Sequence, residues 1–390
     1  MKTTASNRNF STASAIACNS ARVNGATSRA IPQLRFSRTD NIPSPIKTRR
    51  EGPVQYITMA KAEKGNSYDM TLMTALDRAI QQAERDRTVT TIVLESDLEK
   101  TFATGADLTM MKEAPALKAA IKRYDPLLPA SAQQLIFDVI QSAKVDTLAR
   151  QGLVLHQRLA NCSKVTIAKV NGLAVGGGTE TLLACDYILA GNGARFVMPE
   201  HKYGFFPDWG GTERIPQRIG PTMAKFFILE GGLMGKGASG PATLDAQEAL
   251  MLGMVNMVVP PEHLDDTLQV FLSQKPPLQK RKKPQTREEL EKLDADVLAR
   301  LQYPNVPAHL QKSQTRLLEK YNRYKSATLD DLCQNELKDL YRPSLELSWR
   351  RMQTAPRFNW FVHQRDLLQM YFHFVHVITE NERKAEAAKS

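Results

Sequence analysis

The sequence predicts an α/β fold, because segments with strand and helix patterns alternate along its first two thirds. Residues 54–59 form a short alternating apolar run, residues 70–85 place apolar side chains at helical spacing, and residues 91–94 form a second strand-like run. An apolar run at 166–170 then leads through three glycines into a small-residue segment, 179–185, that is typical of a helix. This β-helix-β order is characteristic of α/β folds.

Composition divides the chain into three predicted regions. Residues 1–52 are predicted as a presequence with a linker, residues 53–265 as the α/β core, and residues 266–390 as a helical C-terminal region. The 390 residues are enough for one large domain or two ordinary ones. No run of about 18 apolar residues occurs, so we expect no transmembrane helix and no membrane partner.

Charge is concentrated at the N-terminus. The chain has a formal net charge of +11, and its first 39 residues hold six cations but no acid. These residues are rich in serine and threonine and lack the long apolar centre of a secretory signal, which is typical of an organellar transit peptide. We therefore expect import into the mitochondrial matrix; a disordered tail is the alternative. Much of the net positive charge then belongs to a targeting signal and not to a nucleic-acid-binding surface.

A second basic cluster lies in the predicted C-terminal region, where residues 275–283 contain the run Gln-Lys-Arg-Lys-Lys. Such runs are usually solvated loops, and we interpret this one as a charged linker. A surface facing RNA or an acidic partner is the alternative. Cys18, Cys162, Cys185 and Cys333 form no CxxC pair, which favours a reduced compartment with Cys162 and Cys185 in the core.

Two glycine-bordered turns are candidates for holding a carbonyl oxygen. They are Gly105-Ala106 and Gly176-Gly177-Gly178, and each precedes a predicted helix start. Such turns can point backbone N–H groups at an anion. Preorganised donors stabilise the charge that develops on a thioester oxygen, at about 3 to 4 kcal/mol for one donor. No dinucleotide fingerprint or P-loop is present, so nucleotide-phosphate sites are not indicated.

Glu200 and Asp208 follow the second turn and are candidates for general base, nucleophile and acid. The alternative is structural: Glu200 would cap a strand end, and Asp208 would cap the helix near Thr212. The seven histidines show no metal-ligand spacing with cysteines or acids, so we expect no metal site.

Several motifs together resemble the enoyl-CoA hydratase/isomerase, or crotonase, superfamily. They are FATGADL at 102–108, NGLAVGGG at 171–178, CDYILAG at 185–191 and MPEHKYGFFPDWGG at 198–211. The order of MPE and GFFPDxGG is similar to the 3-hydroxyisobutyryl-CoA hydrolase branch. The resemblance spans roughly residues 54–265 and implies a spiral of ββα turns that binds an acyl-CoA.

The resemblance also implies roles for individual residues. Ala106 and Gly177 would donate their N–H groups to the thioester oxygen, Glu200 would attack the thioester or activate water, and Asp208 would assist. The substrate-binding residues around them would be Thr104, Gly105, Asp107, Gly176 and Gly178. Coenzyme A would be part of the substrate, with no separate cofactor.

Departures from the branch open a second hypothesis. Arg150-Gln151-Gly152 stands where the branch carries a substrate-side glutamate, the segment from 113 to about 148 is longer, and the C-terminal endings differ. The leading prediction is hydrolysis of a short branched 3-hydroxyacyl-CoA. The alternative is a component of the mitochondrial ribosomal small subunit, in contact with its RNA, and a hydratase or isomerase of the same fold comes third. Superfamily members are usually trimers or hexamers, so a homo-oligomer is also expected.

Overall fold

The structure is a computed structural model that describes residues 44–110, 129–203, 205–230, 243–275, 277–328 and 338–353. The predicted presequence, up to residue 43, and residues 113–128 of the predicted insertion lie outside these residues. No helix within the described part of the chain is long and apolar enough to cross a membrane.

The larger of two sheets has six strands in the order β1-β2-β3-β5-β7-β10. All neighbours in it are parallel except β1 and β2. Its strands are β1 (Ile46–Glu51), β2 (Val54–Met59), β3 (Thr91–Ser96), β5 (Val165–Val170), β7 (Tyr187–Gly191) and β10 (Met257–Val259). The predicted strands at 54–59, 91–94 and 166–170 are therefore confirmed.

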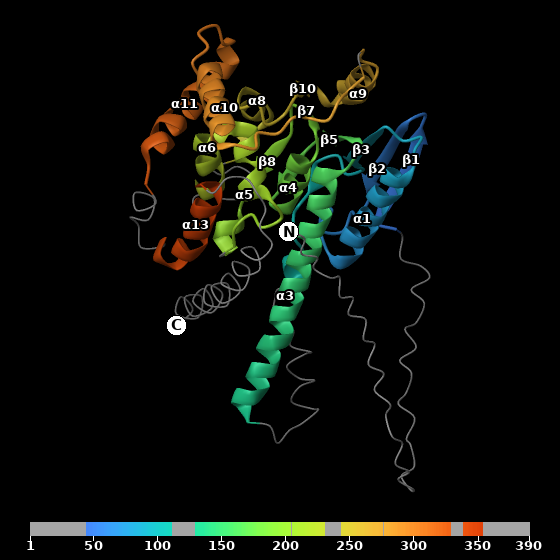
Figure 1. Ribbon diagram of the computed structural model, residues 1–390, viewed down its shortest axis with the longest axis vertical. Helices are drawn as coiled ribbons and strands as arrows, with labels where there is room; N and C mark the ends of the chain where they lie inside the picture. The colour runs from blue at the N-terminus through green and yellow to red at the C-terminus, as the bar shows by residue number, and fades with distance from the viewer. Residues whose placement is uncertain are drawn as a thin grey trace, which may run out of the picture. The chain divides into compact units, whose positions relative to one another are not determined.

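A second sheet has four strands in the order β4-β6-β8-β9, and only β8 and β9 are antiparallel. They are β4 (Thr101–Ala103), β6 (Leu173–Val175), β8 (Arg195–Val197) and β9 (Leu244–Asp245). Successive turns of the chain place one strand in each sheet: β3 then β4, β5 then β6, β7 then β8. This alternation, with helices between turns, is the predicted α/β spiral (Figure 1).

One prediction about the N-terminal boundary differs from the structure. The sequence predicted a linker up to residue 52, whereas β1 pairs along its whole length with β2. Only Ile46 of β1 is buried. An edge strand exposed on both faces carries little apolar alternation, so its sequence does not look like a strand.

Helices cover the two sheets and connect their strands. The predicted helix at 70–85 is confirmed as α1, whose N-terminus is capped by Asp69 through a hydrogen bond from the N–H of Leu72. The other helices of the core are α3 (Ala130–Asn161), α4 (Gly177–Ala184), α5 (Gly211–Arg214), α6 (Pro216–Lys225), α8 (Ala246–Met251) and α9 (Leu264–Leu272).

The C-terminal helices pack on this core. They are α10 (Arg287–Leu301), α11 (Gln311–Ser326) and α13 (Lys338–Gln353), and all three contact α6 (Figure 1). Asp294 of α10 accepts hydrogen bonds from the N–H and hydroxyl of Thr222, at 2.9 and 2.7 Å, and from the hydroxyl of Tyr321 at 2.9 Å. Buried Glu230 likewise binds Lys320 and Tyr324 of α11. The helical region therefore shares the core's packing.

The basic run at 279–283 is more than the solvated linker expected from the sequence, because most of its cations bind the core. The Lys280 ammonium lies 2.6 Å from Asp186, which is fully buried. Arg281 donates to the carbonyl of Gln217 and Lys283 to that of Ala160. The Lys282 side chain is the most exposed cation of this run, at 92%. The run acts as a strap that fastens the C-terminal region to the sheet.

Candidate active site

In the first predicted turn, the residues on both sides of Ala106 form backbone hydrogen bonds, whereas the N–H of Ala106 forms none with the described residues. The N–H of Tyr68 donates to the carbonyl of Gly105 at 2.8 Å, and the N–H of Asp107 donates back to Tyr68 at 3.0 Å. Gly105 has a φ of +80°, in the left-handed region that favours glycine. Between these two bonds, the N–H of Ala106 donates to no described residue.

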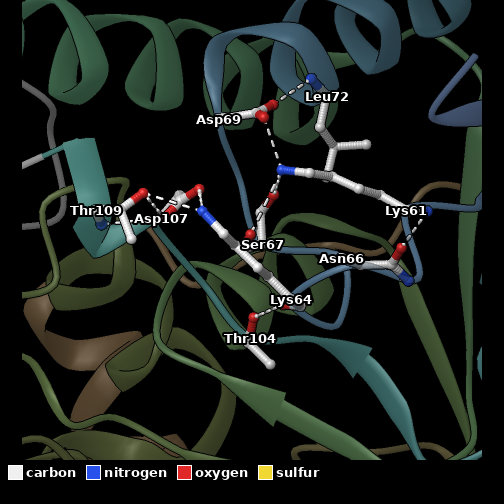
Figure 2. A network of polar contacts seen from close by, with 9 residues as sticks. All are labelled: Lys61, Lys64, Asn66, Ser67, Asp69, Leu72, Thr104, Asp107 and Thr109. Atoms are coloured by element: carbon white, nitrogen blue, oxygen red, sulfur yellow. Dashed lines mark hydrogen bonds and ion pairs between the residues drawn. The ribbon is translucent and has the colours of Figure 1, made fainter. Parts of the chain in front are cut away.

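A polar network clamps this turn to the loop that precedes α1 (Figure 2). The Lys64 ammonium lies 2.9 Å from the carboxylate of Asp107 and 3.0 Å from the hydroxyl of Thr109. Thr104 donates its hydroxyl to the carbonyl of Lys64, and the Asn66 amide donates to the carbonyl of Phe102. The polar groups of Thr104 and Asp107 thus hold the turn in shape. Their predicted role in direct substrate binding stays a prediction.

The second turn lies directly against the first. A Cβ atom added to Gly105 would stand 2.7 Å from the carbonyl oxygen of Val175 and 3.2 Å from the nitrogen of Gly177. One added to Gly178 would stand 2.4 Å from the carbonyl oxygen of Ala103. Glycine is required at both positions because the two backbones approach so closely. The structure therefore brings together the two turns that the sequence predicted as a pair.

Gly177 opens helix α4, with Gly176 as the N-cap at a φ of +51°. Because it is the first helical residue, its N–H has no acceptor within the helix. No other described residue accepts it either. The N-terminal end of α4 also carries the positive end of the helix dipole, which favours negative charge at this place. Ala106 and Gly177 are thus suitably placed, available donors for an anionic oxygen.

Trp209 packs against the second turn. Its indole ring would lie 2.1 Å from a Cβ atom added to Gly177, and 2.1 Å from one added to Gly152 of α3. The ring is 3% exposed and makes an edge contact with Tyr68 at 5.7 Å between centroids. The glycine of Arg150-Gln151-Gly152, one of the departures seen in the sequence, therefore provides the space that this indole occupies.

A buried polar chain continues behind Gly177. The Tyr68 hydroxyl lies 2.6 Å from that of Thr181, which lies 2.9 Å from Nε2 of His156. Nδ1 of His156 lies 2.6 Å from the carbonyl of Gly152, so it carries the proton and Nε2 accepts. Burial lowers the pKa of His156 to about 4, which keeps the ring neutral. The Thr181 hydroxyl also lies 2.9 Å from the carbonyl of Gly177, so its single proton is shared between that carbonyl and Nε2 of His156.

Three carboxyl groups gather beside the second turn. Glu200 begins the 3-10 helix η2 (Glu200–Tyr203), and its Oε1 would lie 2.8 Å from a Cβ atom added to Gly176. Its buried Oε2 has no hydrogen-bond partner among the described residues. Asp208 and Glu180 both interact electrostatically with this group, and Glu180 accepts the N–H of Gly211 at 2.7 Å.

Proximity and burial change the acidity of all three groups. Burial, helped by the charge of Asp208, raises the pKa of Glu200 to about 8. Burial also raises the pKa of Asp208 to about 7. The pKa of Glu180 is raised by burial and by the other two carboxyls, whereas the N–H of Gly211 and the charge of Arg214 oppose the rise. Near neutral pH the cluster therefore holds protons that it can give or take.

The structural alternative for Asp208 is not supported by this geometry. Helix α5 begins after Gly210, which is its N-cap, and it has no side-chain cap, so Asp208 does not cap it. For Glu200, the carboxyl accepts a bond from its own backbone N–H, and Oε2 is left without a partner among the described residues. Within the part of the chain that the structure describes, no group of three metal-ligating side chains could hold a metal ion.

Glu180 is the site residue that the sequence analysis missed. It was counted as part of a small-residue helix, yet it is 2% exposed and stands three residues after Gly177 in the first turn of α4. Acids are common in the first turn of a helix because the positive end of the helix dipole stabilises their charge, so this position alone does not indicate a site residue. Its burial against Gly211, 31 residues later, is what sets it apart.

Comparison with known proteins agrees with the fold. The model of the enoyl-CoA hydratase/isomerase family matches residues 49–135 and 136–292, more than half of the chain. The short-chain-enoyl-CoA hydratase of Clostridium acetobutylicum is 31% identical over 218 residues, which cover 56% of this chain and 70% of that protein. The mitochondrial methylglutaconyl-CoA hydratase of Rattus norvegicus is 29% identical over 194 residues, half of each chain.

Solved structures show the same fold. An enoyl-CoA hydratase from Rhodobacter sphaeroides superposes with a TM-score of 0.50 at 18% identity, covering 85% of each chain. The fold and the family match define a protein class that acts on acyl-CoA thioesters. The chain belongs to the enoyl-CoA hydratase/isomerase family, and its α/β spiral is the crotonase fold predicted from the sequence.

Proposed function

We propose that this protein adds water to the double bond of a 2-enoyl-CoA, or removes it from the 3-hydroxyacyl-CoA. The observation that carries the proposal is the pair of buried carboxyls, Glu180 and Glu200, beside two available N–H groups. Hydration needs one group to take a proton from water and another to deliver one to carbon. The hydratases among the relatives also support this assignment.

The thioester carbonyl would accept both N–H groups, from Ala106 and Gly177. As the water oxygen bonds to C3, electrons move from the double bond onto this carbonyl oxygen, where the two donors stabilise the charge. Glu180 takes the proton from water: burial and the other two carboxyls raise its pKa, which makes it a stronger base when ionised, while the N–H of Gly211 and the charge of Arg214 oppose that rise. Glu200, which has no described donor on Oε2, is protonated and delivers its proton to C2.

Crotonyl-CoA provides the test, followed by loss of the absorbance of the conjugated enoyl thioester. We expect turnover by the wild-type protein and a loss of at least about 100-fold in Glu180→Gln and in Glu200→Gln. Glu262→Gln changes an exposed glutamate outside the site and should match the wild type. A wild-type protein that hydrates no short 2-enoyl-CoA rules this proposal out.

Hydrolysis of 3-hydroxyisobutyryl-CoA is the second candidate, because a third carboxyl, Asp208, faces Glu200. In this reaction ionised Glu200 either activates a water, whose oxygen bonds to the thioester carbon, or attacks that carbon to give an anhydride that water then hydrolyses. The C–S bond breaks, the leaving sulfur takes up the proton released by the water, and free acid and coenzyme A result. A thiol reagent measures its release. Glu180→Gln should spare hydrolysis and abolish hydration. Asp208→Asn should reduce hydrolysis more than it reduces hydration, so the two variants distinguish the candidates.

Three further parts of the proposal rest on the sequence. We expect the reaction to need no cofactor beyond the coenzyme A of the substrate, the protein to reach the mitochondrial matrix, and copies of the chain to associate. Assembly with the mitochondrial ribosomal small subunit and its RNA remains the alternative. Sedimentation of a mitochondrial lysate, with both activities measured across the gradient, tests it: activity confined to the light fractions opposes assembly.

A further inference from the structure

Helix α13 contacts the segments that carry the carboxyl site, although it lies beyond residue 292, where the family match ends. It packs against η2, which begins with Glu200, and against α5, which follows Asp208. Leu347 on this helix is 3% exposed and shares a buried cluster with Phe206 and Ala149. An element outside the family match therefore forms one wall around the site's acids.

Arg351 makes the principal polar contacts of this wall. It is 9% exposed, and its Nη2 lies 2.8 Å from the carboxylate of Glu213. Its Nε donates to the hydroxyl of Thr212 at 3.2 Å, and the guanidinium lies 4.9 Å from the ring centroid of Phe206. Phe206 precedes Asp208 by two residues and Thr212 follows it by four, so one side chain spans the loop on both sides of Asp208.

A second contact joins α13 to η2, the segment that begins with Glu200. The hydroxyl of Ser348, which is fully buried, lies 3.3 Å from Nε2 of His201, the residue after Glu200. Ser348 and Arg351 are three residues apart and lie on one face of the helix. This face therefore reaches both η2 and the loop of Asp208.

We propose that Arg351 is a positioning residue of the carboxyl site: it holds the loop of Asp208 in place and supplies a positive charge near that carboxyl. The inference rests on the proposed function for its effect on turnover, but the contacts and the charge exist whichever acyl-CoA reaction the site performs. Arg351 touches no reacting atom in this assignment. It acts through Asp208, whose charge in turn acts on Glu200.

The charges around Asp208 explain why a cation matters here. The titratable or charged groups that face the site come from four elements: Glu180 on α4, Glu200 and His201 on η2, Glu213 and Arg214 on α5, and Arg351 on α13. Burial raises the pKa of Asp208 and Glu213 adds to the rise, whereas the Arg351 charge lowers it. Without Arg351, the carboxyl of Asp208 should stay protonated to a higher pH.

The test follows the titration of Asp208 directly and then follows turnover. The variants are Arg351→Met and Arg351→Lys, with Arg350→Met, an exposed arginine on the same helix, as the matched control. Aspartate carboxyl carbons labelled with 13C are observed by NMR, and Asp208→Asn assigns the signal. We expect Arg351→Met to raise the titration midpoint of Asp208 by about one pH unit or more, because a charge within a few ångströms changes a pKa by that amount.

Turnover should follow the titration. We expect Arg351→Met to lower kcat about tenfold or more with a smaller change in KM, Arg351→Lys to recover part of both effects, and Arg350→Met to match the wild type. An unchanged Asp208 midpoint in folded Arg351→Met overturns the inference even where turnover falls. A wild-type protein without turnover sinks the proposed function instead, and the NMR titration still decides the role of Arg351.

Discussion

Burial of Glu200 has a consequence for stability as well as for chemistry. Its pKa is about 8 in the folded protein, whereas an unfolded glutamate titrates near about 4.3. Between these values the folded state holds a proton that the unfolded state has released, so the free energy of unfolding falls as pH rises through this window. Above about pH 8 both states are ionised and the contribution levels off.

We therefore expect Glu200→Gln to remove part of this decline. The midpoint of thermal unfolding should fall from pH 5 to pH 8 more steeply in the wild type than in the variant. The remaining slope in the variant includes contributions from Asp208 and Glu180, whose raised pKa values act in the same direction. Glu262→Gln should follow the wild type. Parallel curves for wild type and Glu200→Gln would contradict burial of this carboxyl.

Trp209 and Gly152 should be energetically coupled, because the indole occupies the space above the glycine. Trp209→Ala leaves a cavity and should cost about 3 to 5 kcal/mol of unfolding free energy. Gly152→Ala alone places a methyl group into the ring and should cost about 1 to 3 kcal/mol. In the double variant the methyl group enters the cavity, so the combined cost should be smaller than the sum. Denaturant unfolding measures all four proteins, and strict additivity would refute the contact.

At the scale of elements, the sequence predicted those helices and strands whose buried side chains recur with a regular spacing. The helix at 70–85 was predicted with its observed bounds because its buried side chains recur at helical spacing. The strands at 54–59 and 166–170 were predicted because they are apolar and bounded by turns. The basic run could not be placed, since its anchor, Asp186, lies about 94 residues earlier in the chain. No spacing within the run indicates that partner.

The strap at 279–283 gives a prediction of its own. Asp186 is fully buried and accepts from Thr166 as well as from Lys280 and the N–H of Arg281. Asp186→Ala leaves Lys280 without its anion and the buried N–H and hydroxyl of Thr166 without their acceptor, which should cost about 3 kcal/mol or more of unfolding free energy. Lys282→Ala, on the exposed cation of the same run, should stay within about 0.5 kcal/mol of the wild type. Equal effects of the two substitutions would show that the strap carries no buried ion pair.

At the scale of the whole molecule, the crotonase fold was predictable because its motifs lie in order along one continuous stretch. The pairing of the two N–H turns and the placement of Glu200 and Asp208 beside them followed from that order. Contacts between residues far apart in the sequence could not be predicted. Glu180 reaches Gly211, and Arg351 reaches Glu213 across 138 residues, so neither is visible as a local motif.

The packing of the C-terminal helices predicts one cooperative unit. Asp294 joins α10 to α6 and α11 through three hydrogen bonds, from two groups of Thr222 and from Tyr321. Asp294→Ala leaves these donors unsatisfied, and each buried donor costs about 1 to 3 kcal/mol. Because the helices share the core, we expect a single thermal transition at a lower midpoint, seen alike by circular dichroism and by loss of turnover. An early separate transition in the variant, with turnover retained through it, would show instead that the helical region unfolds independently of the α/β core.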